Sequence, residues 1–289
     1  MNSHHLPHRS EATFDLYPYT PSAIAGYTFL ILFGAVAVAH VVWAIALRAW
    51  YFIPFILGCI GEAGGYYGRT WSHRDIRNGT PYLIQMMLIL GSAPLLAASI
   101  YMVLGRFISG LNAEKYAVLS PRKVTFLYVF IDVVSFVCQI LGSAAQASGE
   151  EGARKGMRVI VGGLAFQLVA CLGFIAMSAT LHVRLNREPT ATSSRPHVYW
   201  RKHMKTLYTV SLLLTIRSLY RFIEFAERAG GSTHNKEALL YVFDALSLFA
   251  TAVCLALVHP GMLLRSIRKA ECKPLPDDSP LAPLRGLKR

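Results

Sequence analysis

Charged side chains are scarce in this sequence. Asp, Glu, Lys and Arg make up 16% of the 289 residues, whereas a soluble domain contains about 25%. Hydrophobic residues make up 54%, and the mean hydropathy is +0.40. This balance is the opposite of that of an intrinsically disordered chain, and it is too apolar for a water-soluble fold of this size. The composition therefore predicts a membrane protein.

Several sequence motifs are also absent. The sequence has no Gly-x-x-x-x-Gly-Lys-Ser/Thr segment, so we expect no nucleotide-binding domain. It has no Gly-x-Ser-x-Gly or His-Glu-x-x-His pattern, the signatures of hydrolases and zinc proteases. His4, His5 and His8 have no acidic or cysteine partner nearby, so a solvated tail is favoured over a metal site. We expect no enzyme activity, no cofactor and no metal.

Seven hydrophobic stretches are long enough to cross a bilayer as helices, which takes about 20 residues. They run over about Ala23–Leu47, Tyr51–Arg69, Pro81–Gly105, Val124–Ala147, Arg158–Val183, Leu207–Arg228 and Ala238–Leu264. The connections between them are short and polar, and residues 1–20 lack the apolar core of a signal peptide. The sequence thus predicts an all-α seven-transmembrane bundle at residues 21–265, with a polar extracytoplasmic tail (1–20) and a basic cytoplasmic tail (266–289).

Basic residues favour one orientation of this bundle. With the N-terminus outside, the inner segments hold about twice as many Lys and Arg as the outer ones, which is the bias expected for cytoplasmic segments. Most of the net charge of +13 then forms a cytoplasmic collar, and the basic tail attracts anionic headgroups of the inner leaflet. We expect no nucleic-acid binding, because no folded basic domain carries this charge. No feature points to a particular oligomeric state.

The five cysteines do not suggest a disulfide. Four of them fall inside predicted spans, where cysteine is usually a small packing residue. Cys272 follows the last span among basic residues, so it is either an ordinary tail cysteine or a palmitoylation site. Asn78 begins a glycosylation sequon in a predicted outer loop, where the following Pro81 and the nearby membrane argue against occupancy.

The informative charges are the few inside the spans, where each costs about 2.5–3.5 kcal/mol near the bilayer centre. Arg217, Arg221 and Glu224 follow the spacing i, i+4, i+7 and so share one helical face. Polar residues in other spans show similar spacing. The candidate substrate-binding residues are Glu62, Tyr66, Arg69, Gln85, Asp132, Gln139, Gln167, Arg217, Arg221, Glu224, Tyr241 and Asp244.

These residues come from six spans, and most of them fall in the outer half of the membrane. One interpretation is a polar cavity near the outer face that binds the head of an amphiphile. Four acids against three arginines favour a cationic head. The alternative is an ion-pair network that only holds helices together. Pro54, Pro94 and Pro260 are candidate hinges, since a proline can kink a span and free a carbonyl.

Seven segments in chain order resemble a known family. They are EAGGYYGR at Glu62–Arg69, Gln85 with APLLAASIY at Ala93–Tyr101, DVVSFVCQILG at Asp132–Gly142, GLAFQ at Gly163–Gln167, RSLYRFIE at Arg217–Glu224, EALLYVFD at Glu237–Asp244 and HPG at His259–Gly261. Together they resemble the fungal lipid-translocating exporters, the seven-span resistance-to-aminocholesterol family.

The resemblance implies a multi-pass protein of the plasma membrane, or of an endomembrane, with an outside N-terminus. It implies export of amphiphilic lipids such as sphingoid long-chain bases, with resistance to sterol-like and drug-like toxic compounds. Some relatives are linked to porphyrin or haem. A seven-helix lipid sensor that regulates other carriers is the alternative function. A haem protein using His40, His182 and His259 is a third hypothesis, although histidines at span ends are more often interfacial.

Overall fold

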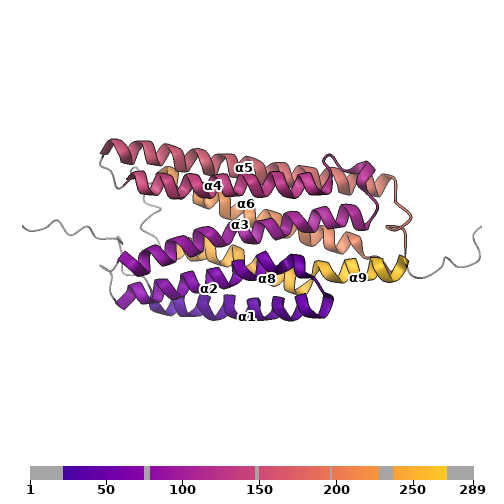
Figure 1. Ribbon diagram of the computed structural model, residues 1–289, viewed down its shortest axis with the longest axis horizontal. Helices are drawn as coiled ribbons and strands as arrows, with labels where there is room; N and C mark the ends of the chain where they lie inside the picture. Colours follow the sequence, from indigo (N-terminus) through magenta and orange to yellow (C-terminus); the bar gives the residue numbers. More distant parts are fainter. Residues whose placement is uncertain (1–21, 75–78, 147–149, 196, 228–236, 272–289) are drawn as a thin grey trace, which may run out of the picture.

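The computed structural model describes residues 22–74, 79–146, 150–195, 197–227 and 237–271, and nearly all of them are helical (Figure 1). The first six long helices are α1 (Ala23–Leu47), α2 (Ile53–Arg74), α3 (Gly79–Gly110), α4 (Pro121–Gln146), α5 (Glu150–Arg187) and α6 (Trp200–Glu227). The seventh segment joins α7 (Glu237–Leu239), the π-helical η4 (Leu240–Ala245) and α8 (Leu246–Leu257). A final helix, α9 (Pro260–Glu271), follows, and short 3-10 turns occupy η1 (Trp50–Phe52) and η2 (Glu114–Tyr116).

Length and composition identify this chain as a multi-pass membrane protein. Five helical segments are long and apolar enough to cross a bilayer: α1, α3, α4, residues 151–187 of α5, and the segment Leu240–Ala270. The remaining two long helices, α2 and α6, are less apolar because they hold five of the seven charged residues buried among the described residues. The predicted all-α membrane fold is confirmed, and the orientation of its termini stays a prediction.

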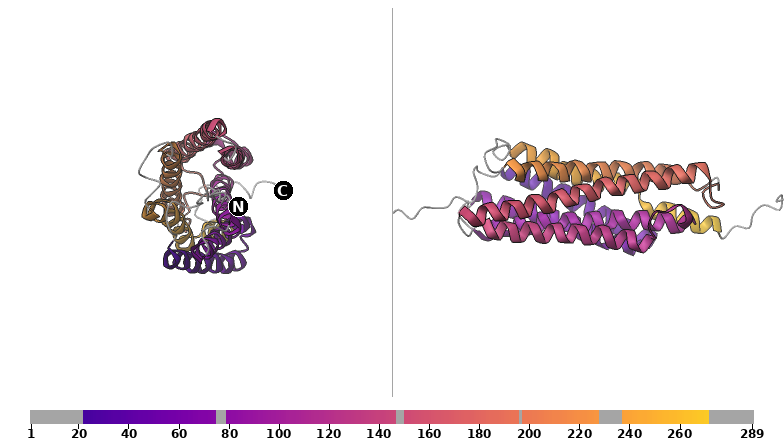
Figure 2. Two further views of the ribbon diagram at one scale, coloured as in Figure 1. Left: turned by 90° about the vertical axis from the view of Figure 1, so that its left-hand side faces the viewer. Right: turned by 90° about the horizontal axis from the view of Figure 1, so that it is seen from above.

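The helices form a ring when viewed end on (Figure 2). Each helix from α1 to α6 packs against its neighbour in the chain, α6 packs against α8, and α8 packs against α1. The ring has an α9 end, where α1, α3 and α5 finish and α2, α4 and α6 start (Figure 1). We call the opposite end, where α1 begins, the α1 end.

Local sequence explains where helices start and stop. Ser22 caps α1, since its hydroxyl accepts a hydrogen bond from the Ala25 amide at 3.4 Å. Arg48 closes α1 in the left-handed conformation at φ 51°. Helix α4 starts at Pro121, where a missing N–H is harmless because the first amides of a helix have no internal partner. Pro260 starts α9 in the same way.

The predicted spans match the helices to different degrees. The first stretch has the bounds of α1, whereas α5 is longer than predicted at both ends. The seventh stretch, Ala238–Leu264, corresponds to the membrane-length segment Leu240–Ala270, which is interrupted between α8, ending at Leu257, and α9, starting at Pro260. Helix α9 also continues past residue 265, into the region predicted as tail. The tail 1–20, Asn78 and Cys272 lie outside the described residues.

Helices α4 and α5 approach closely at two glycines. A Cβ atom on Gly142 would lie 2.6 Å from the backbone oxygen of Gly156 and 2.5 Å from Cγ1 of Ile160. A backbone atom cannot move aside as a flexible side chain can, so this position has no room for a larger residue. The four cysteines in the described residues are free, as predicted.

We expect Gly142→Val to destabilise the bundle by about 1–3 kcal/mol, because it overpacks this contact. Its thermal unfolding midpoint in detergent should fall below that of the wild type. Gly162→Val is the matched control, since a Cβ there meets no atom within 4 Å, and it should unfold near the wild-type temperature. Equal midpoints for both variants would contradict the close approach of α4 and α5.

Candidate functional site

All seven charged residues that the sequence places inside the spans are buried: Glu62, Arg69, Asp132, Arg217, Arg221, Glu224 and Asp244. Buried charges are stable in a protein only when they are paired or hydrogen-bonded. It is therefore informative which of these seven side chains have partners and which do not.

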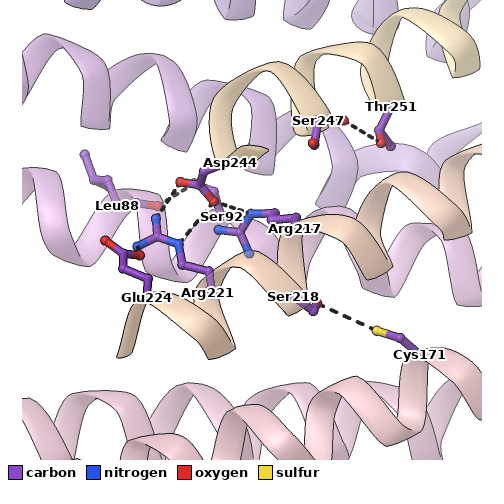
Figure 3. A network of polar contacts seen from close by, with 10 residues as sticks. All are labelled: Leu88, Ser92, Cys171, Arg217, Ser218, Arg221, Glu224, Asp244, Ser247 and Thr251. Carbon is purple, nitrogen blue, oxygen red and sulfur yellow. Dashed lines mark hydrogen bonds and ion pairs between the residues drawn. The ribbon is translucent and has the colours of Figure 1, made fainter. Parts of the chain in front are cut away.

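Asp244 is the centre of one ion-pair cluster. Arg217 Nε lies 2.8 Å from Asp244 Oδ1, and the Arg221 guanidinium binds both carboxylate oxygens of the same residue. Figure 3 shows Asp244 between the two arginine side chains, both of which extend from α6. Arg221 Nη1 also lies 3.4 Å from Glu224 Oε2. Two cations thus share one fully buried aspartate, and the second acid is a more distant partner.

The local backbone explains this convergence. Arg217, Arg221 and Glu224 lie on one face of α6, as their spacing predicted. Asp244 comes from the π-helix η4, a rare element that is frequent at functional sites. A π turn widens the helix by one residue, which changes the direction of the side chains in η4 relative to those of α8. Nothing in the sequence analysis indicated this element.

Arg69 connects α2 to the same π-helix. Its Nε donates a hydrogen bond to the Tyr241 hydroxyl at 2.8 Å, and its guanidinium carbon lies 5.3 Å from the centre of the Tyr241 ring. Phe29 stacks on Tyr241 with ring centres 5.4 Å apart. An aromatic ring from α1 therefore packs against the Tyr241 ring that Arg69 contacts.

Two side chains on α2 are buried without hydrogen-bond partners. Both side chains are 0% exposed. The two carboxyl oxygens of Glu62 and the hydroxyl of Tyr66 have no hydrogen-bond partner among the described residues. The two positions are four residues apart and so lie on one helical face. Glu62 is within electrostatic range of Asp244, Arg217 and Arg221. A buried polar group without a partner costs about 1–3 kcal/mol, so this pair is a candidate for binding a polar ligand group.

A second polar cluster joins α4 to α5. Gln167 donates from Nε2 to Asp132 Oδ1 at 3.1 Å and accepts from the Ser135 hydroxyl at 3.0 Å. Gln139 donates to Ser135 Oγ at 3.3 Å. Gln85 is buried on α3, close to Gly68 of α2. Most of the predicted polar residues thus fall into two groups, one around η4 that takes in residues of α2 and α6, and one that joins α4 to α5. Glu62 and Tyr66 make no hydrogen bond among the described residues.

Comparison with known proteins relates this arrangement to a family. The family model described as "RTA1 like protein" matches residues 55–267, which include every residue of both clusters. The chain belongs to the RTA1-like family. The resemblance read from the seven segments is confirmed.

The chain is also similar in sequence to several individual fungal proteins. Protein RTA1 of Saccharomyces cerevisiae is 31% identical over 86% of this chain and 85% of its own length. Protoporphyrin uptake protein 1 of the same species is 29% identical over 84% of this chain and 91% of its own length. Sphingoid long-chain base transporter RSB1, also from this yeast, is 25% identical over 85% of this chain and 73% of its own length. No solved structure matches the chain significantly.

The three prolines proposed as hinges occupy different positions in the RTA1-like fold. Pro54 lies in the first turn of α2, where a proline removes no hydrogen bond within the helix. Pro94 lies inside α3. Pro260 follows the break at Val258 and His259, between α8 and α9. Their role in motion stays a prediction.

The three histidines considered for haem do not gather at one place in this RTA1-like chain. His40 and His259 have ring centres 5.9 Å apart, and each has one ring nitrogen in a hydrogen bond to the backbone. His182 lies between α5 and α6, with Nδ1 3.2 Å from the Tyr208 hydroxyl. Among the described residues, no group of three or more His, Cys, Asp or Glu side chains could hold a metal ion.

Proposed function

We propose that this chain exports amphiphilic lipids with a cationic headgroup, such as sphingoid long-chain bases, and that sterol-like or drug-like amphiphiles use the same route. Such export would confer resistance to toxic lipophilic compounds. The observation that supports it is a pair of buried groups on α2, Glu62 and Tyr66, which have no hydrogen-bond partner among the residues that the structure describes. The similarity to a yeast protein named as a sphingoid long-chain base transporter supports the substrate class.

The chemistry of the pair suits an amine. A protonated amine has three N–H donors, as the lysine headgroup has, and it can donate to the Glu62 carboxylate and to the Tyr66 oxygen together. The opposite charges then attract in a site of low dielectric constant, where the interaction is strong. Asp244 cannot take this role, because two arginines already bind it.

The arginines and the second cluster have supporting roles in this proposal. Arg217, Arg221 and Glu224 hold Asp244, while Arg69 and Tyr241 position η4 beside α2. Asp132, Gln139 and Gln167 join α4 to α5, and Gln85 faces α2 from α3. A lipid tail extends between the helices into the bilayer while its headgroup occupies the site.

The location of the site fits outward movement. Arg69, Arg221, Glu224 and Asp244 lie toward the α1 end, and Glu62 lies near the middle of α2. With the N-terminus outside, the α1 end faces the outer leaflet, and the plasma membrane is the proposed location. No catalysis is part of this proposal, and the driving force is a gradient or a partner protein.

Purified protein in phosphatidylcholine liposomes tests the proposal. A fluorescent sphingoid base, added with a quencher that cannot cross the membrane, reports transfer between leaflets. We expect transfer that saturates with substrate and is absent from empty liposomes. The matched control is the N-acetylated base, which has the same tail and no charge and should not be transferred. Saturable binding without transfer would instead indicate a lipid sensor and contradict export.

A further inference from the structure

A cavity of about 960 Å³ lies between α3, α4 and α9 at the α9 end of the bundle. A second cavity of about 370 Å³ adjoins it and shares Arg106, Leu264 and Arg268 with it. Both are far along the helices from Glu62 and Asp244, and neither is lined by any residue of the two polar clusters. The proposed export site therefore does not account for them.

The rim of the larger cavity is strongly basic. Arg106 from α3, Arg122 from α4 and Arg268 from α9 line it, and no acidic residue does. None of the three arginines has an acidic partner among the described residues. Three cations from three helices at one opening, with no acidic partner in the part of the chain that the structure describes, favour an anionic ligand.

Tyr51 adds a polar group to the adjoining cavity, beside this rim. The Arg106 guanidinium lies over the Tyr51 ring, with its carbon 4.0 Å from the ring centre. This cation–π contact fixes the guanidinium in position. The Tyr51 hydroxyl is buried and has no hydrogen-bond partner among the described residues, and Tyr51 lines the adjoining cavity with Arg106 and Arg268. A phosphate oxygen is the kind of acceptor that this hydroxyl and these guanidinium groups share.

The wall of the cavity is apolar along α4. Phe126 and Phe130 stack with ring centres 6.2 Å apart, and they are 74% and 55% exposed. From Pro121 to Val133 the lined part of α4 extends about 18 Å, at 1.5 Å per residue. The cavity thus has a basic end and a long apolar side with exposed aromatic rings. A ligand that matches it has an anionic head and a long apolar tail, as a phospholipid has.

We propose that the cavity between α3, α4 and α9 binds an anionic phospholipid. The phosphate binds Arg106, Arg122 and Arg268 at the rim, and an acyl chain lies against Val129, Phe126 and Phe130. The free amides of the first turn of α4, which starts at Pro121, add positive potential at the same place. The charge of the rim distinguishes this ligand from the cationic amphiphile of the export site.

Native mass spectrometry of the full chain tests the proposal. The protein is released from nanodiscs of phosphatidylcholine containing a minority of phosphatidylserine, and the retained lipid is identified. We expect wild-type protein to retain phosphatidylserine in preference to phosphatidylcholine. The triple variant Arg106→Gln, Arg122→Gln, Arg268→Gln should retain it at least about tenfold less, because charge-assisted hydrogen bonds are lost.

A matched variant separates this site from general attraction to the basic surface. Lys123→Gln, Lys205→Gln, Lys269→Gln removes the same charge from exposed residues at the same end, and none of these lysines lines the cavity. It should retain phosphatidylserine as the wild type does. Equal loss in both triple variants, or no loss in either, would overturn the proposal.

A second variant covers the case in which the arginine substitutions disturb folding. Val129→Trp fills the apolar part of the cavity and leaves all three arginines in place. We expect it to lose retained phosphatidylserine while its thermal unfolding midpoint stays near that of the wild type. Excess inorganic phosphate should not release the lipid, because the acyl chain contributes to binding. Retention in Val129→Trp, or release by phosphate alone, would contradict a phospholipid site.

Discussion

Replacement of Asp244 by asparagine is expected to destabilise the folded chain by about 3–5 kcal/mol, because it leaves two buried arginines without their shared counter-ion. Arg217 and Arg221 both bind this carboxylate, and the side chain is 0% exposed. Water cannot easily solvate the two guanidinium groups in its place. The measurement is the thermal unfolding midpoint of purified protein in detergent, together with the amount of folded protein in membranes.

Glu224→Gln is the control for this prediction. It removes an acid from the same cluster, but its partner Arg221 keeps the closer contact with Asp244. We expect a smaller fall in the midpoint than for Asp244→Asn. If Asp244→Asn unfolded at the wild-type temperature, the two arginines would have other partners or water, and Asp244 would not be the centre of the cluster.

Replacement of Glu62 by glutamine should leave the stability of the fold nearly unchanged and reduce lipid transfer. Glu62 has no hydrogen-bond partner among the described residues, so the neutral amide of similar shape breaks no contact. We expect the free energy of unfolding to change by less than about 1 kcal/mol. Transfer of a sphingoid base in liposomes should nevertheless fall at least about tenfold, because the amine loses a charged acceptor whose hydrogen bond contributes about 1.5–3 kcal/mol.

Glu114→Gln makes the same chemical change at an exposed position in η2. It should alter neither the free energy of unfolding nor the transfer of the sphingoid base. Normal transfer by Glu62→Gln would show that another group binds the amine. A large loss of stability in Glu62→Gln would instead assign Glu62 to the packing of the helices. The two buried acids are thus distinguished by measurement: Asp244 through stability and Glu62 through transport.

The sequence predicted which residues are buried better than it predicted how they pair. Charged residues inside apolar stretches must lie in the protein interior, and the structure buries all seven. Spacing also gave the shared face of Arg217, Arg221 and Glu224. Pairing depends on the rotation of each helix about its axis, which spacing within one helix does not determine. The binding of two arginines by Asp244 therefore required the structure.

Backbone irregularities were the other feature that the sequence did not reveal. No residue pattern in the sequence marks the π turns of η4, which contain Tyr241 and Asp244. A proline at residue 260 was visible as a hinge candidate, yet its effect was to separate α9 from α8. That separation lets α9 close one side of the basic cavity, so this cavity could not be foreseen from hydropathy.

The order in which the chain is synthesised gives the ion-pair cluster a further consequence. Helix α6 leaves the ribosome before residues 237–245, so Arg217 and Arg221 enter the membrane before their partner Asp244 exists. Arg69 on α2 is likewise made before Tyr241, to whose hydroxyl it donates a hydrogen bond. Each such arginine is costly in the bilayer core on its own. The final membrane segment therefore supplies a partner for side chains of helices that are made before it. A chain that ends before residue 237 has Arg217 and Arg221 in the membrane without the Asp244 carboxylate that they share.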